Sequence, residues 1–153
     1  AHKDEKDGGP GIEAGLKLLA GSADAQGDRR TFVLAQLAFW LLAATDGHAK
    51  NFSIFLQQGD AYTMTPLYDV ISVWPYFGDG SNQFRRRSAS LAMALRAKNT
   101  HYHLHTLQPR HWHALAMKHG GNATWGAMQA LVAEVEPALA RAFSAGAAPL
   151  ATD

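Results

Sequence analysis

The stretch from Phe32 to Ala44 is apolar at every position except Gln36. A helix without a polar face must be buried on most of its sides, so this stretch predicts the centre of a folded domain. It is also shorter than the ~20 apolar residues that a membrane-spanning helix needs, so no membrane span is expected. Asp28 is a suitable N-cap, and we predict a helix from Asp28 to about Ala44.

The buried helix leads the chain directly into Thr45-Asp46-Gly47-His48-Ala49-Lys50-Asn51, and Asp69 follows after a hairpin-like stretch. Protein kinases use this order: the first Asp accepts the proton of the substrate hydroxyl, and the Asn and the second Asp hold magnesium on the nucleotide phosphates. Each residue alone has a simpler explanation as a turn or cap residue. The order of helix, loop, hairpin and Asp favours a protein-kinase-like C-terminal lobe.

The remaining pattern predicts a fold class that is mainly α with a small β-hairpin. Apolar spacing and the positions of Gly and Pro define the elements. The predicted elements are a mobile entry segment (1–10), a helix (12–20), two paired strands (52–56 and 62–65), a long loop (70–90), a helix from Pro109 to His119, and a last helix from Thr124 with a kink at Pro137.

Composition limits the possible functions of the chain. Its 153 residues suit a single domain, and a net charge of +1 does not indicate binding to nucleic acid or to a membrane surface. The absence of cysteine excludes disulfides, Cys-based zinc sites and thiol nucleophiles. The first residues are charged and no apolar signal-peptide core follows them, so we expect a cytoplasmic protein.

Two clusters of basic or titratable residues have both functional and simpler interpretations. His101, His103 and His105 would share one face of a strand, as in a metal site, but a solvated polar segment is the favoured interpretation. The run Arg85-Arg86-Arg87 could face an acidic substrate, phosphate or DNA, or it could be solvated surface.

Two further candidates lie between Asp46 and Asn51. His48 could contact the nucleotide phosphate or the substrate, and the alternative is an exposed loop histidine. Lys50 could place a positive charge near the transferred phosphate, and the alternative is a solvated lysine.

Two longer motifs resemble a known family. Thr45-Asp46-Gly47-His48-Ala49-Lys50-Asn51-Phe52-Ser53 and Thr65-Pro66-Leu67-Tyr68-Asp69-Val70-Ile71-Ser72 closely resemble the C-terminal domain of HipA-type kinases, which are toxins of bacterial toxin–antitoxin pairs. Residues 7–12 and 108–112 look like further parts of that pattern. The resemblance implies Asp46 as the catalytic base and Asn51 and Asp69 as magnesium ligands. It also implies that His48, Lys50, Asn51, Tyr68 and Asp69 bind the nucleotide.

The resemblance further implies an ATP- and Mg²⁺-dependent serine/threonine protein kinase of a toxin–antitoxin pair. The family's typical substrate is an aminoacyl-tRNA synthetase, and a helix-turn-helix antitoxin neutralises the kinase and tethers it to operator DNA. A rival hypothesis is a non-catalytic interaction lobe that binds an antitoxin and DNA. The intact set of Asp46, Asn51 and Asp69 argues against that rival, because a scaffold needs none of them.

The sequence departs from most protein kinases in three ways. Ala44-Thr45 stands where His-Arg usually precedes the catalytic Asp, and Val70-Ile71 replaces Phe-Gly after the metal-binding Asp. The glycine-rich phosphate loop and the lysine of the N-terminal lobe are also missing from these residues. We therefore expect that the chain is one lobe of a larger kinase and that the isolated chain transfers no phosphate.

Overall fold

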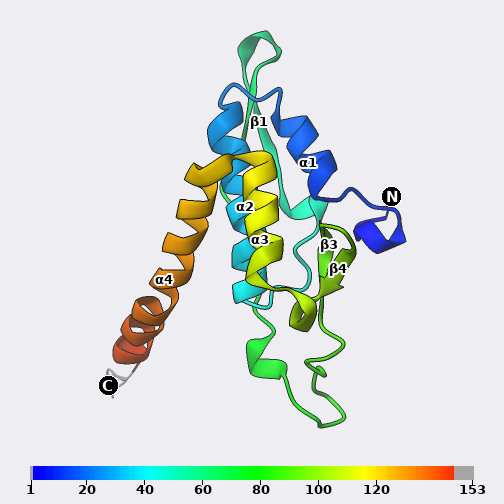
Figure 1. Ribbon diagram of the computed structural model, residues 1–153, viewed down its shortest axis with the longest axis vertical. Helices are drawn as coiled ribbons and strands as arrows, with labels where there is room; N and C mark the ends of the chain where they lie inside the picture. Colours follow the sequence, from blue (N-terminus) through cyan, green and yellow to red (C-terminus); the bar gives the residue numbers. More distant parts are fainter. Residues whose placement is uncertain (1, 147–153) are drawn as a thin grey trace, which may run out of the picture.

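Most of the apolar stretch from Phe32 to Ala44 lies in a helix at the centre of the protein, which ends at Leu41 and not at the predicted Ala44. The computed structural model describes residues 2–146. Helix α2 (Ala25–Leu41) packs against α1 (Ile12–Leu19), α3 (Pro109–His119) and α4 (Gly121–Gly146), as Figure 1 shows. Burial on three sides is the expected result for a helix that has almost no polar face.

The hydrophobic core joins α2 to the other helices and to one of the two small sheets. The core side chains of α2 pack with apolar residues of α1, α3, α4 and strand β3 (Ser90–Arg96). The largest fully buried apolar side chains are Val33, Leu37, Phe39, Met93, Leu95 and Met128. The end of α2, from which the chain continues to Asp46, is therefore fixed by the core.

The start of α2 differs from the prediction. Asp24, not Asp28, is the N-cap, and its side chain accepts a hydrogen bond of 3.0 Å from the backbone N–H of Gly27. Asp28 lies in the first turn and is buried. One oxygen of its carboxylate accepts hydrogen bonds from the Ser22 hydroxyl and, at 2.8 Å, from the Met64 N–H. Asp28 therefore connects α2 to the following hairpin instead of capping the helix.

Replacing Asp28 with alanine should lower the free energy of unfolding by about 2 kcal/mol, because it removes a buried acceptor that the Ser22 hydroxyl and the Met64 N–H share and leaves the Met64 N–H without a partner. Asp24→Ala serves as the comparison, since loss of an exposed N-cap costs only about 1 kcal/mol. Urea denaturation followed by circular dichroism measures both. A larger loss from Asp24→Ala than from Asp28→Ala would contradict this assignment of roles.

The predicted hairpin is confirmed. Strands β1 (Ile54–Leu56) and β2 (Tyr62–Met64) pair antiparallel, with Phe55 opposite Thr63. Pro66 follows the second strand, as expected for a residue that has no N–H to donate to a ladder. This hairpin separates the loop of Asp46 from Asp69.

The structure contains a second β-hairpin, whereas the sequence predicted only one. Strand β3 (Ser90–Arg96) pairs antiparallel with β4 (Thr100–His103), and the register is irregular between Ser90 and Leu95. The β3 sequence is rich in Leu, Ala and Met, which favour helices, so its propensity gave no strand signal. Five consecutive residues of β3, from Leu91 to Leu95, are buried, and this burial outweighs local preference.

The other predicted helices are present. α1 and α3 begin at Ile12 and Pro109 as predicted, whereas α4 begins at Gly121, ahead of the predicted Thr124. The C-terminal half of α4 extends away from the other helices in Figure 1. A kink at Pro137 stays a prediction. None of the helices in the described part of the chain is long and apolar enough to cross a membrane.

The segment before α1 and the long loop contain little regular structure. Residues 5–7 form a 3-10 helix, and the mobility predicted for residues 1–10 stays a prediction. Residues 70–89 contain only the 3-10 helix Trp74–Tyr76 and a bridge between Phe77 and Phe84, in agreement with the predicted loop, and Ser90 begins β3.

Candidate functional site

The chain turns sharply after α2 and presents Asp46 at the surface. Ala43 adopts a left-handed conformation (φ 49°), and the buried Ala44 donates its N–H to the Phe39 carbonyl at 2.7 Å. A Cβ on Gly47 would lie 2.4 Å from the Phe39 ring, so only glycine fits there without a shift of that ring. The core thus fixes the backbone on both sides of Asp46.

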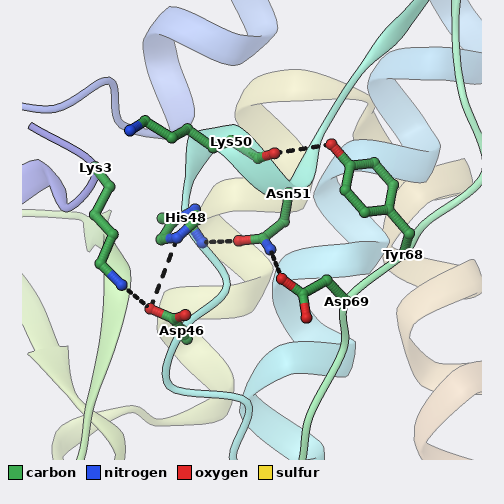
Figure 2. Close-up of polar contacts among 7 residues, drawn as sticks. All are labelled: Lys3, Asp46, His48, Lys50, Asn51, Tyr68 and Asp69. Carbon is green, nitrogen blue, oxygen red and sulfur yellow. Dashed lines mark hydrogen bonds and ion pairs between the residues drawn. The ribbon is translucent and has the colours of Figure 1, made fainter. Parts of the chain in front are cut away.

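Asn51 and Asp69 meet beside this turn. Asn51 ends a 3-10 helix (Ala49–Asn51) and is buried. Its side-chain oxygen accepts a hydrogen bond from the His48 N–H at 2.9 Å, and its amide nitrogen donates to Asp69 Oδ2 at 2.9 Å. Figure 2 shows this chain of contacts next to Asp46. Residues 18 positions apart therefore join in one polar cluster.

Asp69 has an uncommon backbone conformation. Its φ is 55°, in the left-handed region that Asp and Asn tolerate better than most non-glycine residues. The preceding residue, Tyr68, donates its hydroxyl to the Lys50 carbonyl at 2.8 Å and lies 2.7 Å from the Ser53 hydroxyl. These contacts hold the segment that carries Asp69 against the segment that carries Asn51.

Two side chains, those of His48 and Lys3, lie beside the exposed Asp46 carboxylate. His48 is buried, with only 8% of its surface exposed, which contradicts the alternative of an exposed loop histidine. Its Nε2 lies 3.7 Å from Asp46 Oδ1, which is beyond hydrogen-bonding distance. The Lys3 ammonium donates to the same Oδ1 at 2.5 Å. This hydrogen bond raises the pKa of Lys3 above its ordinary value.

The sequence did not indicate that Lys3 would lie at the site. Lys50, which was expected to point toward the phosphates, points away from Asp46. The contact of Lys3 with Asp46 spans 43 positions, and no motif marks it. Lys50 is exposed, and Figure 2 shows its ammonium pointing away from Asp46. A role for Lys50 at the phosphates stays a prediction.

The histidines of the second hairpin do not gather at one point. His101 stacks on His111 with ring centroids 4.1 Å apart, whereas His103 lies against His105 at 5.7 Å. Burial and the neighbouring His101 and Arg110 lower the pKa of His111. Within residues 2–146, no group of three or more His, Cys, Asp or Glu side chains could hold a metal ion.

The oxygen atoms of Asn51 and Asp69 suit a magnesium ion that is shared with a substrate. Asp69 Oδ1 accepts no hydrogen bond from the described residues, and Asn51 Oδ1 accepts only one. Mg²⁺ usually keeps several waters and binds one or two protein carboxylates together with phosphate oxygens. The two side chains fit that small ligand set.

Comparisons with known proteins agree with this fold. Residues 1–143 match the family model described as the HipA-like C-terminal domain. A protein chain in the Shewanella oneidensis MR-1 toxin–antitoxin complex of HipA, HipB and operator DNA is similar in structure, with a TM-score of 0.71 and 20% sequence identity. The match covers 94% of this chain and 31% of that chain, so this chain spans about a third of the length of its match.

Proposed function

The chain belongs to the HipA-like C-terminal domain family, and we propose that it is the catalytic C-terminal lobe of an ATP-dependent serine/threonine protein kinase. The observation that carries this proposal is the meeting of Asp46 with the hydrogen-bonded pair Asn51 and Asp69. A general base beside a magnesium-binding pair is what the C-terminal lobe of a protein kinase contributes to phosphoryl transfer to a hydroxyl.

In the proposed reaction, Asp46 accepts the proton of a serine or threonine hydroxyl. The hydroxyl oxygen forms a bond to the γ-phosphorus of ATP while the bond from that phosphorus to the β,γ-bridging oxygen breaks. ADP leaves with the electron pair of the broken bond, and the proton remains on Asp46. Asn51 and Asp69 would hold Mg²⁺, which neutralises phosphate charge when it is bound.

The surroundings of the site suit a nucleotide. An apolar pocket of about 420 Å³ borders the site at Ala49 and Ser53, and its size and lining suit a flat base. His48 lies beside Asp46, so we propose that it contacts the phosphates when nucleotide is bound. Tyr68 lies against Lys50 and Ser53, where the segment of Asn51 meets the segment of Asp69.

We propose the partners that the family implies. The similar Shewanella structure contains HipA, HipB and operator DNA, which supports a helix-turn-helix antitoxin as partner and operator DNA through that antitoxin. An aminoacyl-tRNA synthetase is the proposed substrate, and these partners would place the protein in the cytoplasm.

The deciding experiment is a phosphotransfer assay with γ-labelled ATP on the full-length protein and its Asp46→Asn variant. The rival is a non-catalytic lobe that binds an antitoxin and DNA. It predicts equal, background labelling of both proteins, together with unchanged binding of the antitoxin. A glycine-rich loop and a lysine in the residues preceding this chain would favour the kinase.

The isolated chain should bind ATP at least about 10-fold more weakly than the full-length protein. Kinases cover the phosphates with the glycine-rich loop of the other lobe and pair them with its lysine. Isothermal titration calorimetry with Mg²⁺ present measures both affinities, and circular dichroism confirms that the isolated chain is folded. Equal affinities would show that the C-terminal lobe alone forms the nucleotide site.

A further inference from the structure

The segment that precedes α1 reaches the proposed catalytic base. The Lys3 ammonium donates to Asp46 Oδ1 at 2.5 Å, and Figure 2 shows this contact beside the Asn51–Asp69 pair. No other side chain among residues 2–146 donates a hydrogen bond to the Asp46 carboxylate. The remaining oxygen, Oδ2, is left free to accept a proton.

The segment carrying Lys3 is attached to the body of the protein. The Glu5 carboxylate accepts hydrogen bonds from the Ala94 N–H at 2.7 Å and from the Arg96 guanidinium, and its side chain is only 10% exposed. The Gly9 N–H closes the turn on the Asp4 carbonyl at 2.9 Å. Lys3 therefore precedes a turn that contacts strand β3 through Glu5.

We propose that Lys3 is a positioning residue for Asp46, an inference that rests on the proposed kinase function. By holding Oδ1, its ammonium fixes the rotation of the carboxylate so that Oδ2 faces the incoming hydroxyl. Asp46 is itself exposed, with 65% of its side chain accessible, and no other side chain of the described residues holds its carboxylate by a hydrogen bond. Reacting groups must be held close to the productive geometry for fast transfer, and this contact supplies that restraint.

The sequence offers a matched control for this inference. Lys6 is an exposed lysine in the same segment and makes no ion pair with the described residues, whereas Lys3 is paired with Asp46. Lys3→Met in the full-length protein should lower kcat by at least about 10-fold while KM for ATP changes by less than about threefold. Lys3→Arg should restore activity to within about threefold, because arginine also donates to a carboxylate.

Two controls separate positioning from folding. Lys6→Met should retain full activity. Lys3→Met should leave the midpoint of thermal unfolding unchanged within about 2 °C, because exposed ion pairs add little stability. Equal kcat for Lys3→Met and the unmodified protein would overturn the role of Lys3 while leaving the kinase function intact. An inactive unmodified protein would overturn both proposals.

A double-mutant cycle tests whether Lys3 acts through Asp46. Residues that act as a unit give losses that do not add, so Lys3→Met should cause no further loss in an Asp46→Asn background. Additive losses would mean that Lys3 works independently of the base, and the proposal would be wrong.

Lysine reactivity supplies a measurement that does not depend on activity. Because the contact with Asp46 raises the pKa of Lys3, less of its amine is neutral and reactive. Acetic anhydride labelling followed by mass spectrometry should modify Lys3 at least about threefold more slowly than Lys6. The difference should disappear in Asp46→Asn. Equal labelling of both lysines in the unmodified protein would show that the contact does not form in solution.

Discussion

Asparagine in place of Asp46 should lower kcat for phosphoryl transfer by the full-length protein at least about 100-fold, the usual scale for loss of a general base. The substitution keeps the volume of the side chain and removes its ability to accept a proton. Since the Asp46 side chain is exposed, the fold should be unaffected. Initial rates with γ-labelled ATP measure the effect.

The control for Asp46→Asn is the same substitution at Asp60, an exposed aspartate in the turn between β1 and β2. Asp60→Asn should leave kcat unchanged. Thermal unfolding of both variants shows whether a loss of activity reflects a loss of structure. Near-normal kcat for Asp46→Asn would remove the main support for a kinase.

The elements that were predicted correctly carry strong local signals. Helix α3 begins at Pro109, a residue that suits the first turn of a helix. The turn residues at 57–60 connect the two strands of the first hairpin. The apolar stretch that ends at Ala44 was correctly placed in the core, because a helix without a polar face has only one stable environment. These signals depend on neighbouring residues, which a single sequence displays.

The features that were missed depend on distant residues. Strand β3 has the composition of a helix, and it is a strand because it is buried and pairs with β4. Asp28 has the residue type of a cap but bonds to Met64, 36 positions away. Lys3 is an ordinary lysine in a charged segment until the fold brings it to Asp46. Tertiary contacts of this kind leave no local pattern.

In the proposed site, too, the local sequence indicated some features and contacts between distant residues determined others. The spacing of Asp46, Asn51 and Asp69 was sufficient to place them together, and the hydrogen bond between Asn51 and Asp69 connects the two segments. The spacing did not indicate that Lys50 would point outward while an amine from the other end of the chain approached Asp46. Backbone order determined which segments meet, whereas side-chain direction required the fold.

Asp69→Asn should lower phosphoryl transfer at least about 100-fold and weaken Mg²⁺-dependent ATP binding, because a hard cation prefers a charged carboxylate to a neutral amide. Asparagine is the informative replacement. It tolerates the left-handed backbone at Asp69 (φ 55°), and its oxygen can still accept the hydrogen bond from Asn51. The loss would therefore come from the missing charge and not from backbone strain.

Asp60 provides the matched control for this substitution as well. It is an exposed aspartate with a left-handed backbone (φ 61°), so Asp60→Asn makes the same chemical change in the same conformation, away from the site. Titration of ATP affinity against Mg²⁺ concentration should show a strong dependence in the unmodified protein and in Asp60→Asn. In Asp69→Asn the dependence should be largely lost. An unchanged Mg²⁺ dependence in Asp69→Asn would mean that the metal is held elsewhere, and the assignment of Asn51 and Asp69 as its ligands would be wrong.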